Sequence, residues 1–194
     1  MRSATIERKT NETSIAVALH IEGKGNSSID FPAMFFGHML ANFSKAGSLD
    51  LKINAKGDLE VDQHHTIEDT GITLGQAFRK ALGDKKGINR AGFFVYPMDE
   101  SLAMVSLDIG GRPFLQYNTK FRRRFCGGFD SDTLEDFFYG FSIGLGANVV
   151  VKATGRSDHH KIEAIFKAFG KATKMACSKD KRLKEYIPST KGVI

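Results

Sequence analysis

The segment His64-His65-Thr66-Ile67-Glu68 recurs about half a chain later, in a sequence of 194 residues, as His159-His160-Lys161-Ile162-Glu163. Each copy follows a short predicted strand and a turn that contains glycine, and each opens a long predicted helix. Another predicted helix precedes each copy, near His38 in the first half and near Asp136 in the second. Similarity at a fixed offset is typical of an internal duplication. The sequence therefore predicts two half-domains of the same kind.

The predicted boundaries are residues 1–90 for the first half-domain, 91–178 for the second and 179–194 for a basic C-terminal tail. Hydrophobic periodicity predicts strands over residues 13–21, 49–53, 59–61, 92–96, 102–109, 115–117 and 148–153. It predicts helices over residues 33–46, 66–82, 133–144 and 160–175. Two halves of this kind would pack their helices together between two sheets, which makes an α+β sandwich.

Composition and charge exclude several classes of protein. The chain is 41% hydrophobic and 26% charged, so it can bury a core and is not intrinsically disordered. No apolar run approaches the roughly 18 residues that a membrane helix needs. The first residues carry no apolar signal core, and Cys126 and Cys177 make no disulfide framework, so we expect a cytoplasmic protein. The net charge of +6 fits either an anionic substrate or a nucleic acid.

Four of the six histidines fall in the two repeated motifs. His64 and Glu68 are i,i+4 neighbours on one helix face, as are His159 and Glu163, and an imidazole with a carboxylate makes half of a divalent metal site. The second histidine of each pair, His65 or His160, is rotated by about 100° around the helix axis from the first, so both cannot easily bind one ion. Each motif is therefore predicted to serve two metal ions. Helix capping by surface histidines is the alternative interpretation, and the spacing leaves Mn, Fe, Ni, Co and Zn open.

Residues 57–72 resemble the first signature of the imidazoleglycerol-phosphate dehydratase family, and residues 157–169 resemble its second. Further matches follow in family order over residues 8–13, 38–40, 97–100, 111–113 and 188–192, so the resemblance covers nearly the whole chain. It implies duplicated half-domains with the helices between two four-stranded sheets, like domain 2 of ribosomal protein S5. It also implies an assembly of 24 subunits built from trimers, with two Mn²⁺ ions per active site at subunit interfaces.

The activity that this resemblance implies is dehydration of imidazole glycerol phosphate to imidazole acetol phosphate in histidine biosynthesis. Metal ions on the imidazole would stabilise an imidazolate and a diazafulvene intermediate. The implied metal ligands are His38, His64, His65, Glu68, Asp136, His159, His160 and Glu163. Glu163 and Glu12 are the candidate catalytic bases, with a slight preference for Glu163.

Cations and hydroxyl groups are expected to bind the substrate's phosphate. Arg90, Arg112, Lys167, Ser189 and Lys191 stand at the positions where the family binds it, and Glu12 and Asp99 match family positions near the substrate.

Several positions depart from the family pattern. Gly37 replaces an Asp or Asn, Ala46 and Asp136 each replace a histidine, and Asn148-Val149 stands where Thr-Leu-His is usual. Asp136 can still bind a divalent ion, whereas Ala46 cannot.

Two other functions remain open at this point. The histidine clusters would also suit a metal-storage protein or a scaffold, although such a protein needs no phosphate site. The run Arg122-Arg123-Arg124 would suit a nucleic-acid binder, although a solvated loop explains it equally well. We expect no nucleic-acid or membrane partner.

Overall fold

The computed structural model describes residues 2–184 and 186–194. The first half-domain contains β1 (Ser3–Lys9), β2 (Thr13–His20), β3 (Ser27–Asp30), α1 (Met34–Gly47), β4 (Asp50–Gly57) and α2 (His64–Leu82). The second contains β5 (Ala91–Met98), β6 (Ser101–Asp108), β7 (Phe114–Asn118), α3 (Leu134–Leu145), β10 (Asn148–Thr154) and α4 (Asp158–Cys177). A small ribbon of β8 (Phe125–Cys126) and β9 (Phe129–Asp130) follows β7, and short 3₁₀ helices lie at Ser131–Thr133 and Lys181–Leu183.

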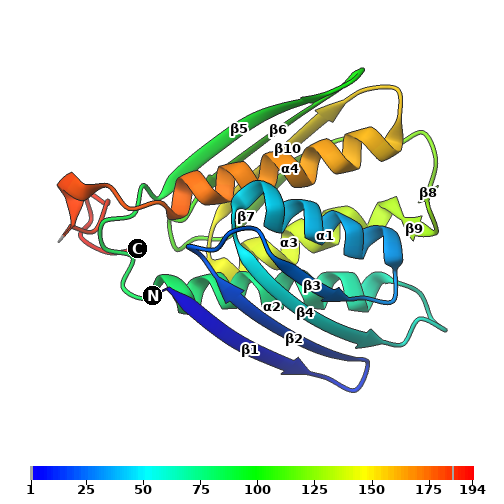
Figure 1. Cartoon of the computed structure of the whole chain (residues 1–194), viewed down its shortest axis with the longest axis horizontal. Coiled ribbons are helices and arrows are strands. Elements are labelled where there is room, and N and C mark those ends of the chain that lie inside the picture. Colours follow the sequence, from blue (N-terminus) through cyan, green and yellow to red (C-terminus); the bar gives the residue numbers. More distant parts are fainter. Residues whose placement is uncertain (1, 185) are drawn as a thin grey trace.

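The two halves share one topology. The sheet of the first half has the order β1-β2-β4-β3, and that of the second has the order β5-β6-β10-β7. In each sheet the short third strand is parallel to its neighbour, β4 or β10, and the other pairs are antiparallel. The four helices lie between the two sheets (Figure 1). The predicted α+β sandwich of duplicated halves is confirmed.

Most predicted elements exist, with ends shifted by a few residues. Helices α2 and α4 begin at His64 and Asp158, two residues before the predicted starts at 66 and 160, so both histidine pairs lie inside the first turn. The strand predicted over residues 59–61 is wrong, because the chain turns there after β4 ends at Gly57. The strands β1 and β3 were not predicted, since β1 buries only Ala4 and β3 buries no residue. Hydrophobic alternation therefore gave no signal at these edges of the sheet.

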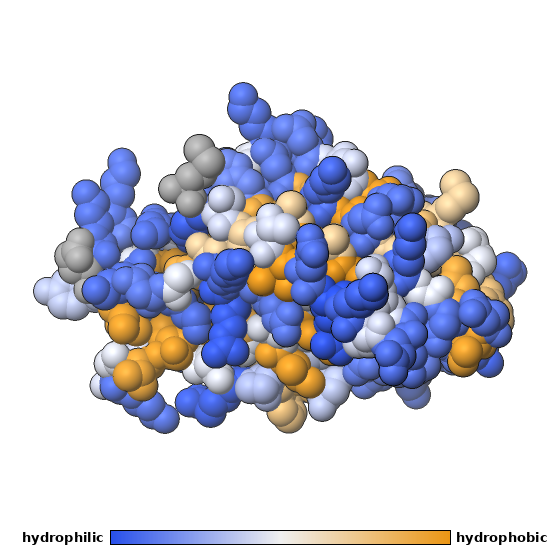
Figure 2. Space-filling model, turned by 90° about the horizontal axis from the view of Figure 1, so that it is seen from below, coloured by the Kyte–Doolittle hydropathy of each residue, from blue (hydrophilic) through white to orange (hydrophobic). Residues whose placement is uncertain are grey.

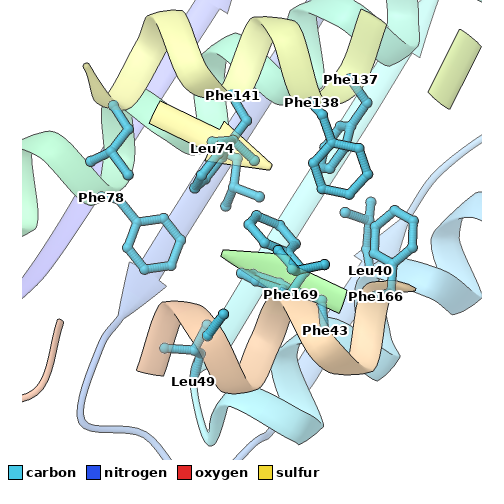
Figure 3. Close-up of a cluster of buried hydrophobic side chains, with 14 of the residues drawn as sticks. Leu40, Phe43, Leu49, Leu74, Phe78, Phe137, Phe138, Phe141, Phe166 and Phe169 are labelled. Carbon is cyan, nitrogen blue, oxygen red and sulfur yellow. The ribbon is translucent and has the colours of Figure 1, made fainter. Parts of the chain in front are cut away.

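Phenylalanines fill the space between the helices. Phe43 of α1 stacks on Phe169 of α4 with ring centroids 4.4 Å apart, and Phe141 of α3 meets the same ring edge-on at 4.8 Å. Phe78 of α2 lies edge-on to both Phe43 and Phe141 (Figure 3). All four helices thus contribute to one aromatic cluster, and aromatic pairs in such arrangements add about 0.5–1.5 kcal/mol each beyond their buried area.

Glycines allow the helices to pack closely in pairs. A Cβ on Gly71 or Gly75 of α2 would collide with the backbone of α3, and one on Gly144 of α3 would collide with the backbone of α2. Gly170 of α4 lies against the backbone of α1 in the same way. The pairs α2–α3 and α1–α4 therefore come together backbone to backbone. Because α2 and α4 start at the same end of the molecule, both histidine pairs lie at that end (Figure 1).

The outer faces of the sheets are exposed in this chain. The face on the side of β1 and β2 is mostly hydrophilic, with scattered hydrophobic side chains (Figure 2). On the other sheet, Phe93, Val95, Leu102 and Phe114 are exposed. No helix among the described residues is long and apolar enough to cross a membrane.

Candidate active site

The first turn of α2 faces the start of α3. His64 Nδ1 lies 3.1 Å from Oδ2 of Asp136, and His64 Nε2 lies 3.8 Å from Oε2 of Glu68 one turn later. All three side chains are about one third to two fifths exposed, so the group opens to solvent. The predicted partners His64, Glu68 and Asp136 are thus brought together, and the close α2–α3 packing holds them there.

The first turn of α4 repeats this arrangement against α1. His159 Nε2 lies 3.4 Å from Oε2 of Glu163, whose other oxygen accepts a bond of 2.7 Å from Lys167. Burial acts to raise the pKa of Glu163, but the hydrogen bond from Lys167 and the charges of Lys167, His159 and His38 lower it overall. His38 of α1 therefore belongs to this group, where its ring also contacts Asn42.

The second histidine of each pair is oriented by acidic residues in the loops at the ends of the strands, Asp58 after β4 and Glu100 in the turn between β5 and β6. His65 Nδ1 lies 3.1 Å from Oδ2 of Asp58 and 3.8 Å from Glu12. In the second half, His160 Nδ1 lies 3.0 Å from Oε2 of Glu100 and 3.6 Å from Asp99. The hydrogen bonds that His65 donates to Asp58 and His160 donates to Glu100 raise the pKa of each imidazole, and the bond from His160 lowers the pKa of Glu100 to about 2.

These donors fit divalent metal ions. The groups Glu12–Asp58–His65 and Asp99–Glu100–His160 each offer ligand atoms within 4.8 Å of one another. A carboxylate on Nδ1 fixes the ring of a metal-binding histidine and leaves Nε2 for the ion. Mixed imidazole and carboxylate donors suit Mn, Fe, Co, Ni or Zn. The adjacent histidines face different carboxylates, as the predicted 100° separation requires.

A second group of predicted residues lies at the opposite end of the molecule. Arg90, which follows α2 and precedes β5, donates to both oxygens of Asp108 at 2.6 and 2.9 Å and to the carbonyl of Pro188 at 2.9 Å. The tail that carries Ser189 and Lys191 is thereby held to the second sheet. The turn before Arg112 lies beneath the last residue of this tail, because a Cβ on Gly111 would be 3.0 Å from the carbonyl carbon of Ile194.

The two ends are too far apart for one small substrate. Arg90 bonds through its backbone to Ala176 near the end of α4, whereas His159 lies in its first turn. At about 1.5 Å per residue, the helix separates them by roughly 25 Å. Of the residues predicted to bind substrate or phosphate, Glu12, Asp99 and Lys167 contact members of the histidine groups, and Arg90, Arg112, Ser189 and Lys191 lie at the tail end.

Comparisons with known proteins decide the family. The family model of imidazoleglycerol-phosphate dehydratase matches residues 32–173. This chain belongs to that family. The imidazoleglycerol-phosphate dehydratase of Koribacter versatilis is 52% identical over 195 residues, with both chains covered completely. The histidine biosynthesis bifunctional protein of Legionella pneumophila is 49% identical over an alignment of 193 residues that covers 100% of this chain and 54% of that protein.

The fold comparison agrees. The crystal structure of the Pyrococcus furiosus dehydratase superposes with a TM-score of 0.84 at 33% identity, covering 97% of this chain and 100% of that one. Membership of the imidazoleglycerol-phosphate dehydratase family makes this chain an enzyme of the hydro-lyase class. It also assigns the chain to histidine biosynthesis.

The departures from the dehydratase family pattern have distinct structural settings. Gly37 is buried on α1, where a Cβ would lie 3.3 Å from that of Phe31. Ala46 lies on α1 beside Gly170 of α4, away from the histidine end. Val149 is fully buried under the second sheet, whereas Asn148 donates to the carbonyl oxygen of Arg112 at 3.2 Å. Only Asp136 lies within a histidine group.

Sequence reasoning missed Asp58, Glu100, Asp108 and Asn148. Glu100 had a signal, since Glu12 and Glu100 stand just before the first residues of β2 and β6, Thr13 and Ser101. The duplication therefore pairs them. Asp58 stands within residues 57–72, which resemble the family signature, but its residue type and position there did not mark it as a partner of His65. Asp108 had no signal, because nothing in its local sequence distinguishes it from an ordinary strand residue.

Proposed function

We propose that this chain dehydrates imidazole glycerol phosphate to imidazole acetol phosphate with two divalent metal ions per active site, Mn²⁺ being the expected ion. The observation that carries this proposal is the repeated group of histidines and carboxylates at one end of α2 and α4. Family membership supports the substrate. The two unpaired cysteines and the phosphorylated substrate support a cytoplasmic location.

The metal ligands proposed from the first group are His64, Glu68 and Asp136, with His65 on its other side. Those from the second group are His159, Glu163 and His38, with His160 beside them. When bound, such ions act as Lewis acids that withdraw charge from an imidazole ring and orient it. Asp58 and Glu100 hold the rings of His65 and His160, so these two act by orientation.

The carboxylates of this chain supply the catalytic base and further metal ligands. A base must take the proton from the carbon next to the imidazole, and Glu163 and Glu12 are the candidates. Both oxygens of Glu163 are engaged, one by Lys167 at 2.7 Å and the other by His159 at 3.4 Å. Glu12 is half exposed and lies 3.8 Å from His65. This geometry favours Glu12 as the base and Glu163 as a ligand.

The tail end supplies the phosphate-binding group in this proposal. Arg112 and Lys191 are exposed, and Arg90 keeps N–H donors that no other described residue engages. Because the two ends of one chain lie roughly 25 Å apart, the tail of a neighbouring subunit has to meet the histidine end. A homo-oligomer, expected to be a 24-mer of trimers, would provide this contact.

The test is turnover of imidazole glycerol phosphate by chelator-stripped protein, with and without added Mn²⁺. Production of imidazole acetol phosphate only after Mn²⁺ is restored would support the proposed reaction and its metal. Tight binding of metal by an intact oligomer without any product would contradict it and favour a metal-storage protein.

A further inference from the structure

Asp108 and Asn148 are cross-strand partners at the tail end of the second sheet. They face each other in the antiparallel register of β6 and β10, and β5 pairs its first residue, Ala91, with Asp108 as well. Together with Arg90 and Ser106 they line a surface pocket of about 500 Å³. Neither residue is among the phosphate-binding candidates, yet each contacts one of the two arginines in that set.

Asp108 holds Arg90 by a bidentate pair. Arg90 Nε donates to Oδ1 at 2.6 Å and Nη2 donates to Oδ2 at 2.9 Å, and these bonds raise the pKa of the guanidinium. Two parallel N–H···O bonds fix the plane of a guanidinium as well as its position. The remaining nitrogen, Nη1, donates to the carbonyl of Pro188 at 2.9 Å. Since a guanidinium has five N–H groups, one on each Nη has no partner among residues 2–184 and 186–194 and can serve a ligand.

The backbone of Arg90 shows that the surrounding structure determines its position. Its φ of 68° lies in the left-handed region, which is strained for a non-glycine residue. The amide of Arg90 donates to the carbonyl of Ala176 at 3.0 Å, and its carbonyl accepts from Ile109 at 3.1 Å. The side chain therefore starts from a fixed backbone and ends on Asp108.

Asn148 acts on the second arginine through its backbone. Its Nδ2 donates to the carbonyl oxygen of Arg112 at 3.2 Å. The same turn is fixed by a bond of 2.8 Å from the amide of Gly111 to the carbonyl of Gly146. The side chain of Arg112 stays exposed, so it remains available to a ligand.

We propose that Asp108 and Asn148 are positioning residues for an anionic phosphate group. Asp108 aligns the guanidinium of Arg90, which in turn holds the tail by its hydrogen bond to the carbonyl of Pro188. Asn148 fixes the turn that carries Arg112. This inference rests on the proposed function, in which the tail end binds the substrate's phosphate. The carboxylate of Asp108 does not itself face the anion as a ligand, because both its oxygens accept from Arg90.

The experiment uses the full-length, metal-loaded protein and three variants: Asp108→Asn, Asn148→Ala and, as a matched control, Asp50→Asn. Asp50, the first residue of β4 on the other sheet, is 34% exposed against 38% for Asp108, and it likewise accepts two hydrogen bonds, from the amides of Lys24 and Asn26 in the loop before β3. The probes are inorganic phosphate, followed by calorimetry, and imidazole glycerol phosphate, followed by KM and kcat. Trypsin cleavage after Lys191 reports the tail, and thermal melting checks folding.

Losing one charge-assisted pair is expected to weaken phosphate binding and to raise KM about 10-fold in Asp108→Asn, with kcat within about 2-fold. The same variant should be cut faster at Lys191, whereas Asn148→Ala should raise KM by about 3-fold without releasing the tail. Asp50→Asn should change neither KM nor cleavage.

The proposal would be overturned if both Asp108→Asn and Asn148→Ala bind inorganic phosphate as tightly as the wild type does, or more tightly. If Asp108→Asn fails to fold, Asn148→Ala alone decides. A wild-type protein that binds phosphate but shows no dehydratase turnover would contradict the proposed reaction while leaving the positioning roles testable by calorimetry.

Discussion

Glu12 and Glu163 differ in what surrounds them, and glutamine at each position separates a base from a ligand. Glu12→Gln should lower kcat by about 100-fold or more, the contribution of a general base, while bound metal stays at the wild-type level. Glu163→Gln should lose metal, because its oxygen lies 3.4 Å from His159 in the same group. Metal content by elemental analysis and kcat with saturating Mn²⁺ would measure both. Full turnover by Glu12→Gln would remove it as the base.

Glu22 and Arg2 tie the N-terminus to the rest of the chain. Burial acts to raise the pKa of Glu22, but the hydrogen bond and charge of Arg2 lower it below its ordinary 4.5. A lowered pKa in the folded state means stability that is present above pH 4.5 and is lost as the pH falls further. Because Glu22 is half exposed, we expect Glu22→Gln to cost about 0.5 kcal/mol at pH 7.

Urea unfolding of the wild type and Glu22→Gln at pH 7 and at pH 3 would measure this difference. The two proteins should converge at the lower pH. A difference that persists unchanged there would show that Arg2 does not stabilise the fold through the carboxylate charge.

The contacts of single residues were only partly predictable. The pairing of His64 with Glu68 follows from helical spacing alone, and the repeat extended it to His159 and Glu163. The bond between Asp108 and Arg90 depends on how β5 and β6 align in the sheet. No local pattern in the sequence contains that register.

Helix pairs α2–α3 and α1–α4 depend on glycine at their closest approach. Gly144→Ala should destabilise the fold by about 1–3 kcal/mol, since the new methyl group would overlap the carbonyl oxygen of Ile72. It should also weaken metal binding, because separating the two helices moves His64 from Asp136. Gly37→Ala, a helical glycine with its nearest contact at 3.3 Å, is the control and should change stability by no more than about 1 kcal/mol.

Urea unfolding and metal titration would measure both effects. Wild-type stability in Gly144→Ala would show that the helices separate without cost.

At the level of elements, amphipathic helices and inner strands were predictable because their buried faces leave a periodic pattern. The strand β3 has four residues and none is buried, so it exists only because β4 offers it a parallel neighbour. The turn at residues 59–61 looked like a strand because Leu59 and Val61 alternate with Glu60, yet both apolar side chains are exposed. Alternation predicts a strand only where one face has a core to cover it.

For the whole molecule, the distance between the histidine end and the tail end of one chain predicts that two inactive variants can restore activity to each other in a mixed oligomer. His64→Ala should abolish turnover and weaken assembly, and Lys191→Ala should raise KM with little loss of metal. Mixed oligomers reassembled from His64→Ala and a doubly altered tail, Arg112→Ala with Lys191→Ala, should recover part of the wild-type activity. Where chains of the two variants are neighbours, an intact histidine end meets an intact tail.

The assay is turnover after joint dissociation and reassembly, with His64→Ala mixed with His159→Ala as the control. These two variants damage the same end of the chain. Equal recovery in both mixtures would contradict the need for two different ends.

A chain of half this length, folded as one sheet and two helices, would leave the phenylalanine faces of its helices in water. Two such chains would have to associate as a dimer to bury these faces, and the dimer would dissociate on dilution. Joining them by a short connection between α2 and β5 gives each half an effective concentration of the other that is roughly millimolar or higher. The shared core therefore persists at any protein concentration, and only the contacts between whole chains can be diluted away.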